Sequence, residues 1–349
     1  MKIVIDVPEE IVREVKEAVK RGGYEDSKEF IRTAIETQIE LETSEQQTLL
    51  TFDDAFEELE QSDSLPHNQS KPEPSDVHQV QAELENRSFE PLQVVNEPDR
   101  SRLDDGPLWG QYNRVFPIKL VTRRLANVLL GKSGDEEWIE LERFSDQTAT
   151  VARNVGKKLL EEDEAKSRGR GEKLSAALPI GDNAQKSMDR FKSHFVGYSD
   201  RNGNLTGAPA HLLFVDITSE SPSKIGLTDA GRQLASIHNP LLDDGLSADE
   251  ALSRDEVEFL VSFFREELPA EYEAMLTIAR AIENDQTRPT QLTERIATLN
   301  QSWTDAQAKT IRSGLVSRMY EMGMVKRHRV GQRGTAYELT LRGESLLKL

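Results

Sequence analysis

The chain has 349 residues, of which 62 are acidic and 44 basic, so its formal net charge at pH 7 is −18. This length exceeds that of one ordinary domain and indicates two or three structural units. The absence of cysteine excludes a disulfide framework and thiolate metal sites, and no apolar run reaches the roughly 18 residues of a membrane span. We therefore expect a cytoplasmic protein that does not enter a membrane.

The first 42 residues predict one strand and two helices. Apolar and other residues alternate over 2–7, which is typical of a short strand. Pro8 opens a helix that Gly22-Gly23 ends, and Asp26 with Glu29 forms a capping-box pattern for a second helix. Because one strand and two helices bury too little apolar surface to fold alone, we expect residues 1–42 to form a homodimer.

The run GGYEDSKEFIRTAI, joined to a strand that ends in Val-Pro-Glu-Glu, resembles the ribbon-helix-helix family of MetJ/Arc/CopG type. The resemblance implies that two chains pair their strands and that the outward side chains of this ribbon read the major groove of DNA. Lys2 is the conventional DNA donor on that face, whereas Asp6 would meet phosphates. Two interpretations stay open for this module, a DNA-binding dimer and a dimer clasp that does not touch DNA.

Residues 43–105 are strongly acidic and poor in clustered apolar residues. They carry sixteen acidic side chains against four basic ones, a net charge of −12, and include the run PHNQSKPEPSD. Such a segment buries too little surface to offset the entropy lost on ordering. The composition predicts a disordered acidic linker.

The rest of the chain predicts mainly helices with a few short strands, and the fold class is therefore mainly α with short β. Apolar spacing and helix-stop signals predict the following helices: Phe116–Gly131, Ser145–Glu162, Asn183–His194, Ser253–Glu267, Ala270–Asn284, Thr290–Leu299 and Asp305–Met322. A strand is predicted over His211–Thr218, and a short strand followed by a helix over Ile225–Ile237.

In residues 250–349, three of these helices precede a basic two-stranded hairpin that begins at Val325. The run SGLVSRMYEMGMVKRHRV resembles the winged helix-turn-helix family, in which a recognition helix ends at a glycine before the wing. The resemblance implies that this helix and the wing contact double-stranded DNA. The candidate DNA-binding residues are Gln307, Lys309, Thr310, Ser313, Ser317 and Arg318 on the helix and Lys326, Arg327, Arg329 and Arg333 on the wing.

The pattern Leu-Thr-x-x-Gly-x-x-Leu occurs twice, from Leu227 and from Leu339. In the C-terminal copy it fits the exit from the second wing strand into a final helix, with the threonine as the N-cap. The earlier copy therefore predicts a second, diverged winged helix over residues 108–240. Its third helix would expose Lys186, Arg190 and Lys192 to DNA, and the loop Lys166–Lys173 is either a phosphate-gripping element or a solvated insertion.

Catalytic templates are not matched. The run LLGKSG resembles a phosphate-binding loop, but Ala126 stands where the first glycine is required and a helix replaces the preceding strand. The six histidines show no metal-ligand spacing, and no serine has the context of a nucleophile elbow. We expect no catalytic residue, no cofactor and no metal.

These observations predict a dimeric, sequence-specific DNA-binding protein that acts as a transcriptional regulator. Two alternatives remain, a DNA-binding protein of plasmid partition or replication control and a protein-interaction scaffold that does not bind DNA. The abundance of Asp and Glu with few lysines is similar to the proteins of salt-accumulating, halophilic archaea.

Overall fold

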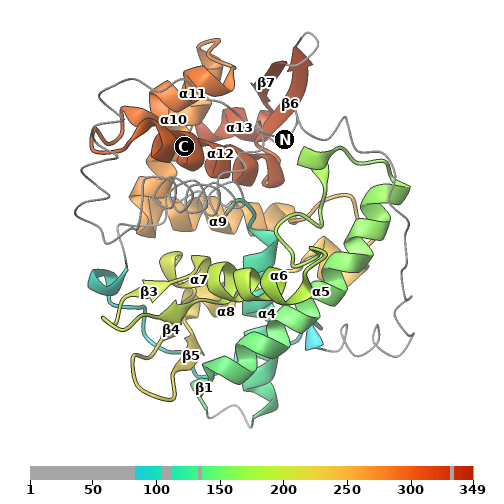
Figure 1. Ribbon diagram of the computed structural model, residues 1–349, viewed down its shortest axis with the longest axis vertical. Helices are drawn as coiled ribbons and strands as arrows, with labels where there is room; N and C mark the ends of the chain where they lie inside the picture. Colours follow the sequence, from blue (N-terminus) through green and yellow to red (C-terminus); the bar gives the residue numbers. More distant parts are fainter. Residues whose placement is uncertain (1–82, 104–111, 133–135, 331–333, 349) are drawn as a thin grey trace, which may run out of the picture. The chain divides into compact units, whose positions relative to one another are not determined.

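The computed structural model describes residues 83–103, 112–132, 136–330 and 334–348. Every described residue belongs to one of the two units into which the chain divides, the unit Leu65–Leu349. The module predicted for residues 1–42, with Lys2, lies outside the described residues, and so does Arg333 of the wing. The described part is mainly helical with small sheets (Figure 1), which confirms the coarse fold class, mainly α with short β.

Residues 112–236, here called the middle module, alternate helices with short strands. The helices are α4 (Phe116–Gly131), α5 (Leu141–Ala165), α6 (Ala184–Phe191), the π-helix η5 (Lys192–Val196), α7 (Ala208–His211) and α8 (Asp229–Ser236). The strands are β1 (Trp138–Glu140), β2 (Tyr198–Ser199), β3 (Leu205–Thr206), β4 (Val215–Ile217) and β5 (Lys224–Leu227). Strand β5 is central in an antiparallel sheet of order β1-β5-β4, and β2 and β3 form a separate hairpin.

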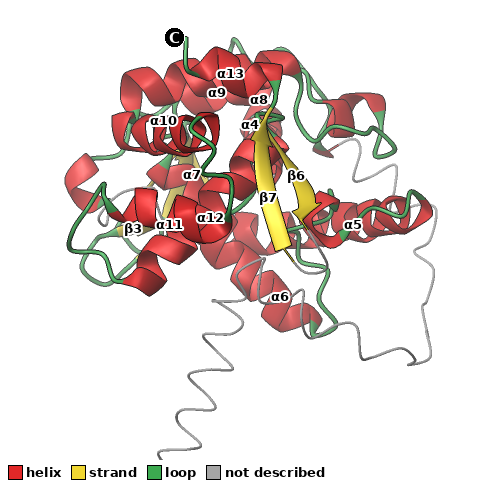
Figure 2. Ribbon diagram, turned by 90° about the horizontal axis from the view of Figure 1, so that it is seen from above, coloured by secondary structure: helices red, strands yellow, loops and turns green. Residues whose placement is uncertain are grey.

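Residues 268–348, here called the C-terminal module, follow α9 (Arg254–Glu267). The elements are α10 (Pro269–Glu283), α11 (Pro289–Ala297), α12 (Asp305–Glu321), β6 (Val325–Val330), β7 (Gly334–Leu339) and α13 (Leu341–Leu346). Each of α9 to α12 lies within two residues of its predicted bounds, because Ser253 and Thr304 cap helices and Pro269 and Pro289 begin them. Seen from above, β6 and β7 lie beside α12 (Figure 2).

The two copies of the repeated pattern form the same strand-to-helix exit. The hydroxyl of Thr228 accepts a hydrogen bond from Gly231 N at 3.1 Å, and the hydroxyl of Thr340 accepts one from Gly343 N at 3.1 Å. Each threonine is the N-cap of the following helix, α8 or α13. The prediction of two equivalent exits is therefore confirmed at the level of single hydrogen bonds.

The glycine of each copy is required by a close approach to the backbone just before the first hairpin strand. A Cβ on Gly231 would collide with the carbonyl oxygen of Phe214, and a Cβ on Gly343 would collide with that of Met324. The same two oxygens accept hydrogen bonds from the N-cap amides, Thr228 N at 3.1 Å and Thr340 N at 2.9 Å. The two hairpins therefore pack on their exit helices in the same way.

The residues that enter the two hairpins also correspond. Leu213 and Gly323 precede β4 and β6 with φ of 60° and 69°, and the hydroxyls of Thr228 and Thr340 donate to their carbonyls. The four-residue helix α7 thus stands where the C-terminal module has the last turn of α12. The helix predicted over Asn183–His194 forms as α6 and η5. It is separated from β4 by β2, β3 and α7, so it does not lead directly into the hairpin as α12 does.

Two further expectations are corrected. The strand predicted over His211–Thr218 forms only at Val215–Ile217, because Pro209 begins a helical turn that includes His211. The linker predicted over residues 43–105 is ordered over 83–103, where Leu84, Phe89 and other apolar side chains are buried. Val95 N donates to Leu227 O at 2.9 Å, so this segment pairs with the end of β5 and finds a backbone partner there.

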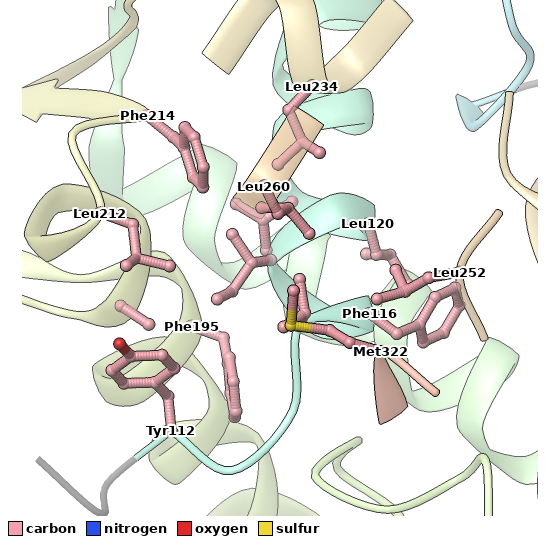
Figure 3. Packing of buried hydrophobic residues seen from close by; sticks show 14 of the residues in the cluster. Tyr112, Phe116, Leu120, Phe195, Leu212, Phe214, Leu234, Leu252, Leu260 and Met322 are labelled. Atoms are coloured by element: carbon pink, nitrogen blue, oxygen red, sulfur yellow. The ribbon is translucent and has the colours of Figure 1, made fainter. Parts of the chain in front are cut away.

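The buried apolar residues form one cluster that extends from Leu84 to Leu346 and includes both modules. Figure 3 shows Tyr112 beside Phe195 and Leu212, and Met322, which follows α12, near Phe116 of α4. Helix α4 is therefore central to the packing of the described residues.

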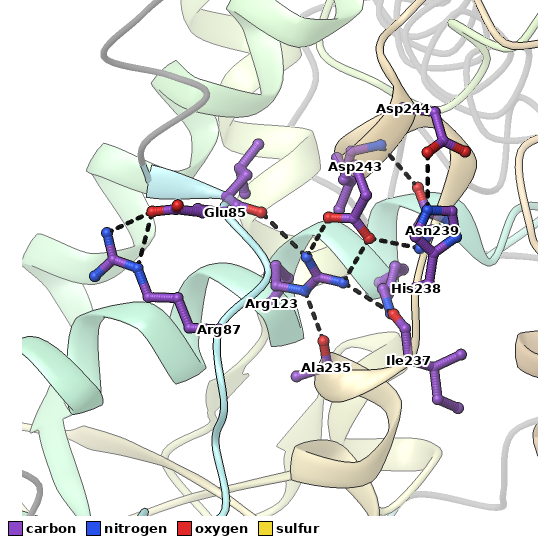
Figure 4. Close-up of polar contacts among 12 residues, drawn as sticks. Glu85, Arg87, Arg123, Ala235, Ile237, His238, Asn239, Asp243 and Asp244 are labelled. Carbon is purple, nitrogen blue, oxygen red and sulfur yellow. Dashed lines mark hydrogen bonds and ion pairs between the residues drawn. The ribbon is translucent and has the colours of Figure 1, made fainter.

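Polar contacts also hold α4 in place. The guanidinium of Arg123 donates to Asp243 at 2.8 Å and to the carbonyls of Ala235 and Ile237 at 2.6 and 2.9 Å (Figure 4). Lys119 forms an ion pair with Glu256 at 3.0 Å, and both side chains are fully buried. Burial lowers the pKa of Lys119 to about 8, against the attraction of Glu256. These contacts hold the end of α8 and the start of α9 against α4.

Candidate nucleic-acid interface

Helix α12 begins with a capping box and ends at a glycine. The hydroxyl of Thr304 accepts from Gln307 N at 3.2 Å, and the side-chain oxygen of Gln307 accepts from Thr304 N at 2.8 Å. At the other end, Gly323 takes a φ of 69°, which favours glycine and ends the helix. Four apolar residues at helical spacing along α12 are all buried: Ala308, Ile311, Leu315 and Met319.

The candidate DNA-binding residues of α12 divide into two groups. Gln307 is exposed, and Lys309 and Thr310 are half-buried, so the first two turns of the helix reach the surface. Ser313, Ser317 and Arg318 in the second half are 8%, 2% and 2% exposed. In this arrangement the second half of α12 does not offer its side chains to an external partner.

Arg318 is held in a buried polar cluster. Its guanidinium donates to Glu271 of α10 at 2.7 Å and to the carbonyl of Tyr112 at 2.6 Å, and it lies 4.0 Å from the centroid of the Tyr112 ring. Burial acts to lower the pKa of Arg318, but Glu271, Tyr112 and Glu321 together outweigh it and the pKa is raised. Arg318 therefore stays charged and serves as an internal partner.

The residues before α4 make further contacts with the end of α12. Arg114 donates to the carbonyl of Ser317 at 2.9 Å and to that of Gly171 at 3.0 Å. The carboxylate of Glu321 accepts from the amides of Val115 and Phe116, at the N-terminus of α4. Burial raises the pKa of Glu321, and Arg114 opposes this shift. Sequence patterns gave no signal for these contacts, because the partners lie about two hundred residues apart.

The basic residues of the wing differ in their exposure to solvent. Lys326, His328 and Arg329 on β6 are exposed, and the strand pairs with β7 in a register that places Lys326 opposite Glu338. Within the ranges that the structure describes, no acidic side chain lies within ion-pair distance of Lys326 or Arg329. The positive charge of these two residues is therefore available at the surface.

Arg327 has a different environment from its neighbours on β6. It is half-buried, its guanidinium lies 5.7 Å from the centroid of the Tyr337 ring, and a Cβ on Gly171 would collide with it. Arg327 therefore packs between its own hairpin and the loop 166–173 of the middle module. The side chain of Arg327 is therefore part of the packing of the protein as well as a positive charge on the wing.

The loop 166–173 is held by acidic side chains. Lys166 and Arg168 pair with Asp249 at 2.6 and 3.0 Å, and Arg168 also pairs with Asp163 at 3.1 Å. The buried carboxylate of Asp163 further accepts from the amide and hydroxyl of Ser175 at 3.0 and 2.6 Å. Lys166 and Arg168, two basic residues that were candidates for phosphate binding, are thus paired with carboxylates within the protein.

The candidate residues of the middle module lie on α6 and η5. Lys186 and Arg190 are exposed, whereas Lys192 pairs with Asp146 at 3.0 Å and with Asp189 at 2.7 Å. The β4–β5 hairpin of this module contains no base before Lys224, so it differs in charge from the basic β6–β7 hairpin. Within the described ranges, only the C-terminal module combines an exposed helix start with a basic hairpin.

A pocket of about 160 Å³ lies at the C-terminal end of α12, with Arg114, Lys173, Glu321 and Arg342 among its lining residues. Among the described residues, no group of three His, Cys, Asp or Glu side chains is placed to hold a metal ion. Within the same ranges, no helix combines the length and the hydropathy that a bilayer crossing requires.

Comparison of the chain with family models, with curated proteins and with solved structures found no match.

Proposed function

We propose that this chain is a dimeric, sequence-specific DNA-binding protein that regulates transcription. The observation that carries the proposal is the pair of exposed basic side chains Lys326 and Arg329 on the β6–β7 hairpin, which have no ion-pair partner among the described residues. The hairpin contacts α12, whose first two turns reach the surface. The chain has a net charge of −18, so most of its surface repels a polyanion such as DNA. A local basic surface therefore defines where DNA would bind. The helix start and hairpin correspond to the recognition helix and wing of a winged helix.

Each exposed residue has a chemical role in this proposal. A helix that enters a groove by its N-terminal end presents its first turns to base edges, here Gln307 and Thr310. The side-chain oxygen of Gln307 is engaged in the capping box, which leaves its amide N–H groups to donate to acceptors on a base. Lys326 and Arg329 contact phosphates, which fix the position of the helix without reading sequence.

The structure leaves fewer candidate DNA-contacting residues than the sequence alone indicates. Ser313, Ser317 and Arg318 are buried, and Arg327 packs against Gly171. The primary DNA contacts proposed are therefore Gln307, Lys309, Thr310, Lys326 and Arg329, with Arg333 outside the described residues.

The proposed dimer rests on residues 1–42 and their resemblance to the ribbon-helix-helix family. Two linked DNA-binding modules raise affinity through effective concentration, provided that both reach their half-sites together. Sedimentation equilibrium of the full chain should give twice the mass of one chain. A monomer at micromolar concentration would remove the dimer from the proposal and leave the DNA contacts of the C-terminal module to be tested separately.

Selection of bound sequences from a random duplex DNA pool tests the DNA-binding proposal. We expect the wild type to enrich a defined motif and Lys326→Ala/Arg329→Ala to lose most of its affinity for that motif. Arg201→Ala/Lys224→Ala is the matched control, because it removes two exposed bases from hairpins of the middle module. No enrichment by the wild type, or equal losses in the two double variants, would contradict the proposal.

One observation favours a second candidate, a protein-interaction scaffold. The second half of α12 already packs on other protein segments, so the C-terminal module has at least one face that serves protein contact. A scaffold would give no enriched motif and no difference between the two double variants. The same selection therefore separates the two candidates.

A further inference from the structure

The second half of α12 is covered by four residues that precede α4, Tyr112–Val115, here called the latch segment. Its contacts with α12 are the Tyr112 ring and carbonyl on Arg318, Arg114 on the carbonyl of Ser317, and the amide of Val115 on Glu321. The covered residues include Ser317 and Arg318, which occupy the outward face expected to meet DNA in a winged helix. The latch segment and a DNA groove would compete for the same face.

The two arginines of this contact, Arg114 and Arg318, each have a second partner inside their own module. Arg318 remains paired with Glu271 of α10 if Tyr112 withdraws, and Arg114 remains bonded to the carbonyl of Gly171 if Ser317 withdraws. Separation of the two surfaces therefore leaves neither guanidinium without a partner. Since orphaned buried charges are what make such contacts costly to break, this arrangement lowers the cost of opening.

Apolar packing at the same place keeps the closed arrangement dominant. Met322, directly after α12, is fully buried near Phe116 of α4, and Tyr112 is buried beside Phe195 and Leu212 (Figure 3). Opening exposes part of this surface to water and so costs free energy. The apolar packing at this contact therefore favours the closed state. The hydrogen bonds of Arg318 to Glu271 and of Arg114 to Gly171 remain when the contact opens.

We propose that the latch segment is an autoinhibitory contact, which holds the second half of α12 against the middle module and limits the DNA contacts to the helix start and the wing. Opening uncovers Ser317 and the side of the Arg318 guanidinium that Tyr112 covers, while the ion pair of Arg318 with Glu271 is kept. Because a binding-competent state that is rarely populated weakens apparent affinity by its population, any change that loosens the latch strengthens DNA binding. This inference rests on the proposed DNA-binding function.

Opening can be measured without DNA, because the chain contains no cysteine. A single Ser317→Cys reports uncovering of α12 by its rate of reaction with a thiol reagent. Ala274→Cys, at a fully buried position in α10, reports unfolding of the core, and Ser262→Cys, at an exposed position in α9, gives the unhindered rate. We expect Ser317→Cys to react at least tenfold faster than Ala274→Cys, because local opening precedes global unfolding.

The decisive variant is Arg114→Ala, with Arg100→Ala as the control. Arg114→Ala removes the bond to Ser317 and should raise the Ser317→Cys reaction rate about tenfold while leaving that of Ala274→Cys unchanged. Arg100→Ala removes one arginine and an ion pair to Glu267, away from α12, and should leave both rates unchanged. Equal reaction rates at positions 317 and 274, or no acceleration by Arg114→Ala, would overturn the latch.

The DNA arm of the experiment separates the latch from the proposed function. Arg114→Ala should bind the selected DNA several-fold more tightly than the wild type, although losing a positive charge by itself weakens DNA binding. Tighter binding together with faster labelling supports the latch. Faster labelling with unchanged or weaker DNA binding overturns its inhibitory role, and a failure of every variant to bind DNA overturns the proposed function instead.

Discussion

At the residue scale, one threonine and one glycine recur where each hairpin passes into its last helix. The threonine closes the first turn of the helix, and the glycine lets the helix lie against a backbone carbonyl. A side chain at the glycine position has no room, because the nearest atom is a backbone oxygen that cannot rotate away. This pair accounts for the repeated sequence pattern without any role in binding.

Substitution of Gly231 tests this account. Gly231→Ala places a Cβ against the carbonyl oxygen of Phe214 and should lower the free energy of unfolding by about 1–3 kcal/mol, as overpacking does. Gly131→Ala at the end of α4 is the control, because nothing lies within 4 Å of its added Cβ. Urea denaturation of the two variants should show a loss for Gly231→Ala alone. Equal free energies of unfolding for the two variants would show that the hairpin backbone can move to admit the added Cβ without loss of stability.

His194 gives a pH dependence at the same scale. Burial, with a smaller contribution from the charge of Arg190, lowers the pKa of His194 to about 4 from its ordinary value near 6.5. The unfolded chain therefore takes up a proton between pH 6.5 and 4 that the folded protein does not. Stability contributed by neutral His194 is present above pH 6.5 and is lost as the pH falls through 4.

We predict that His194→Gln flattens the decline of thermal stability over this pH range. Midpoints of thermal unfolding for the wild type and the variant, measured in steps from pH 7 to pH 4, provide the test. The difference between the two proteins should be largest at pH 7 and should shrink toward pH 4. A constant difference across the range would show that His194 does not contribute to the acid sensitivity.

At the element scale, α12 has two halves with different surroundings. Its first two turns reach solvent, and its second half lies among Arg114, Glu271 and Tyr112. The ion pair between Arg318 and Glu271 is buried on both sides. Removing one member of such a pair leaves the other charge in a poorly solvated place, and this cost exceeds the strength of the pair itself.

Glu271→Ala should therefore destabilise the protein by about 3–5 kcal/mol. Glu267→Ala is the matched control, since it removes an ion pair with Arg100 whose side chains are about half exposed and should cost less than about 1 kcal/mol. Chemical denaturation measures both values. A loss at Glu271 no larger than that at Glu267 would show that Arg318 finds another partner and that the pair does not hold α12.

Helix bounds were predictable because caps and breakers are local signals. Phe116–Gly131 is predicted and observed with the same bounds, with Pro117 in the first turn and Gly131 at the end. The covering of Ser317 was not predictable, because small and polar outward residues allow close approach by DNA and by another part of the same protein alike. The ordered structure of residues 83–103 was not predicted, because their few apolar side chains are buried only through contacts with residues distant in the sequence, such as the end of β5.

At the scale of the whole molecule, charge is distributed unevenly along the chain. The net charge is −18, yet residues 300–349 carry nine basic side chains against four acidic ones. In the described part of this segment, Arg312 and Arg318 are buried, whereas Lys326 and Arg329 remain exposed. The composition predicted in which segment the basic residues are concentrated. The three-dimensional structure determines which of them are exposed and able to contact a polyanion.

The salt dependence of DNA affinity tests the central claim most directly. Each phosphate that a side chain neutralises contributes about −0.9 to the slope of log affinity against log salt concentration. Affinities for the selected duplex, measured by fluorescence anisotropy between about 50 and 200 mM salt, should give a slope that is shallower by about 2 in Lys326→Ala/Arg329→Ala than in the wild type. The Arg201→Ala/Lys224→Ala control should keep the wild-type slope. The same slope in all three proteins would contradict a DNA contact through the wing.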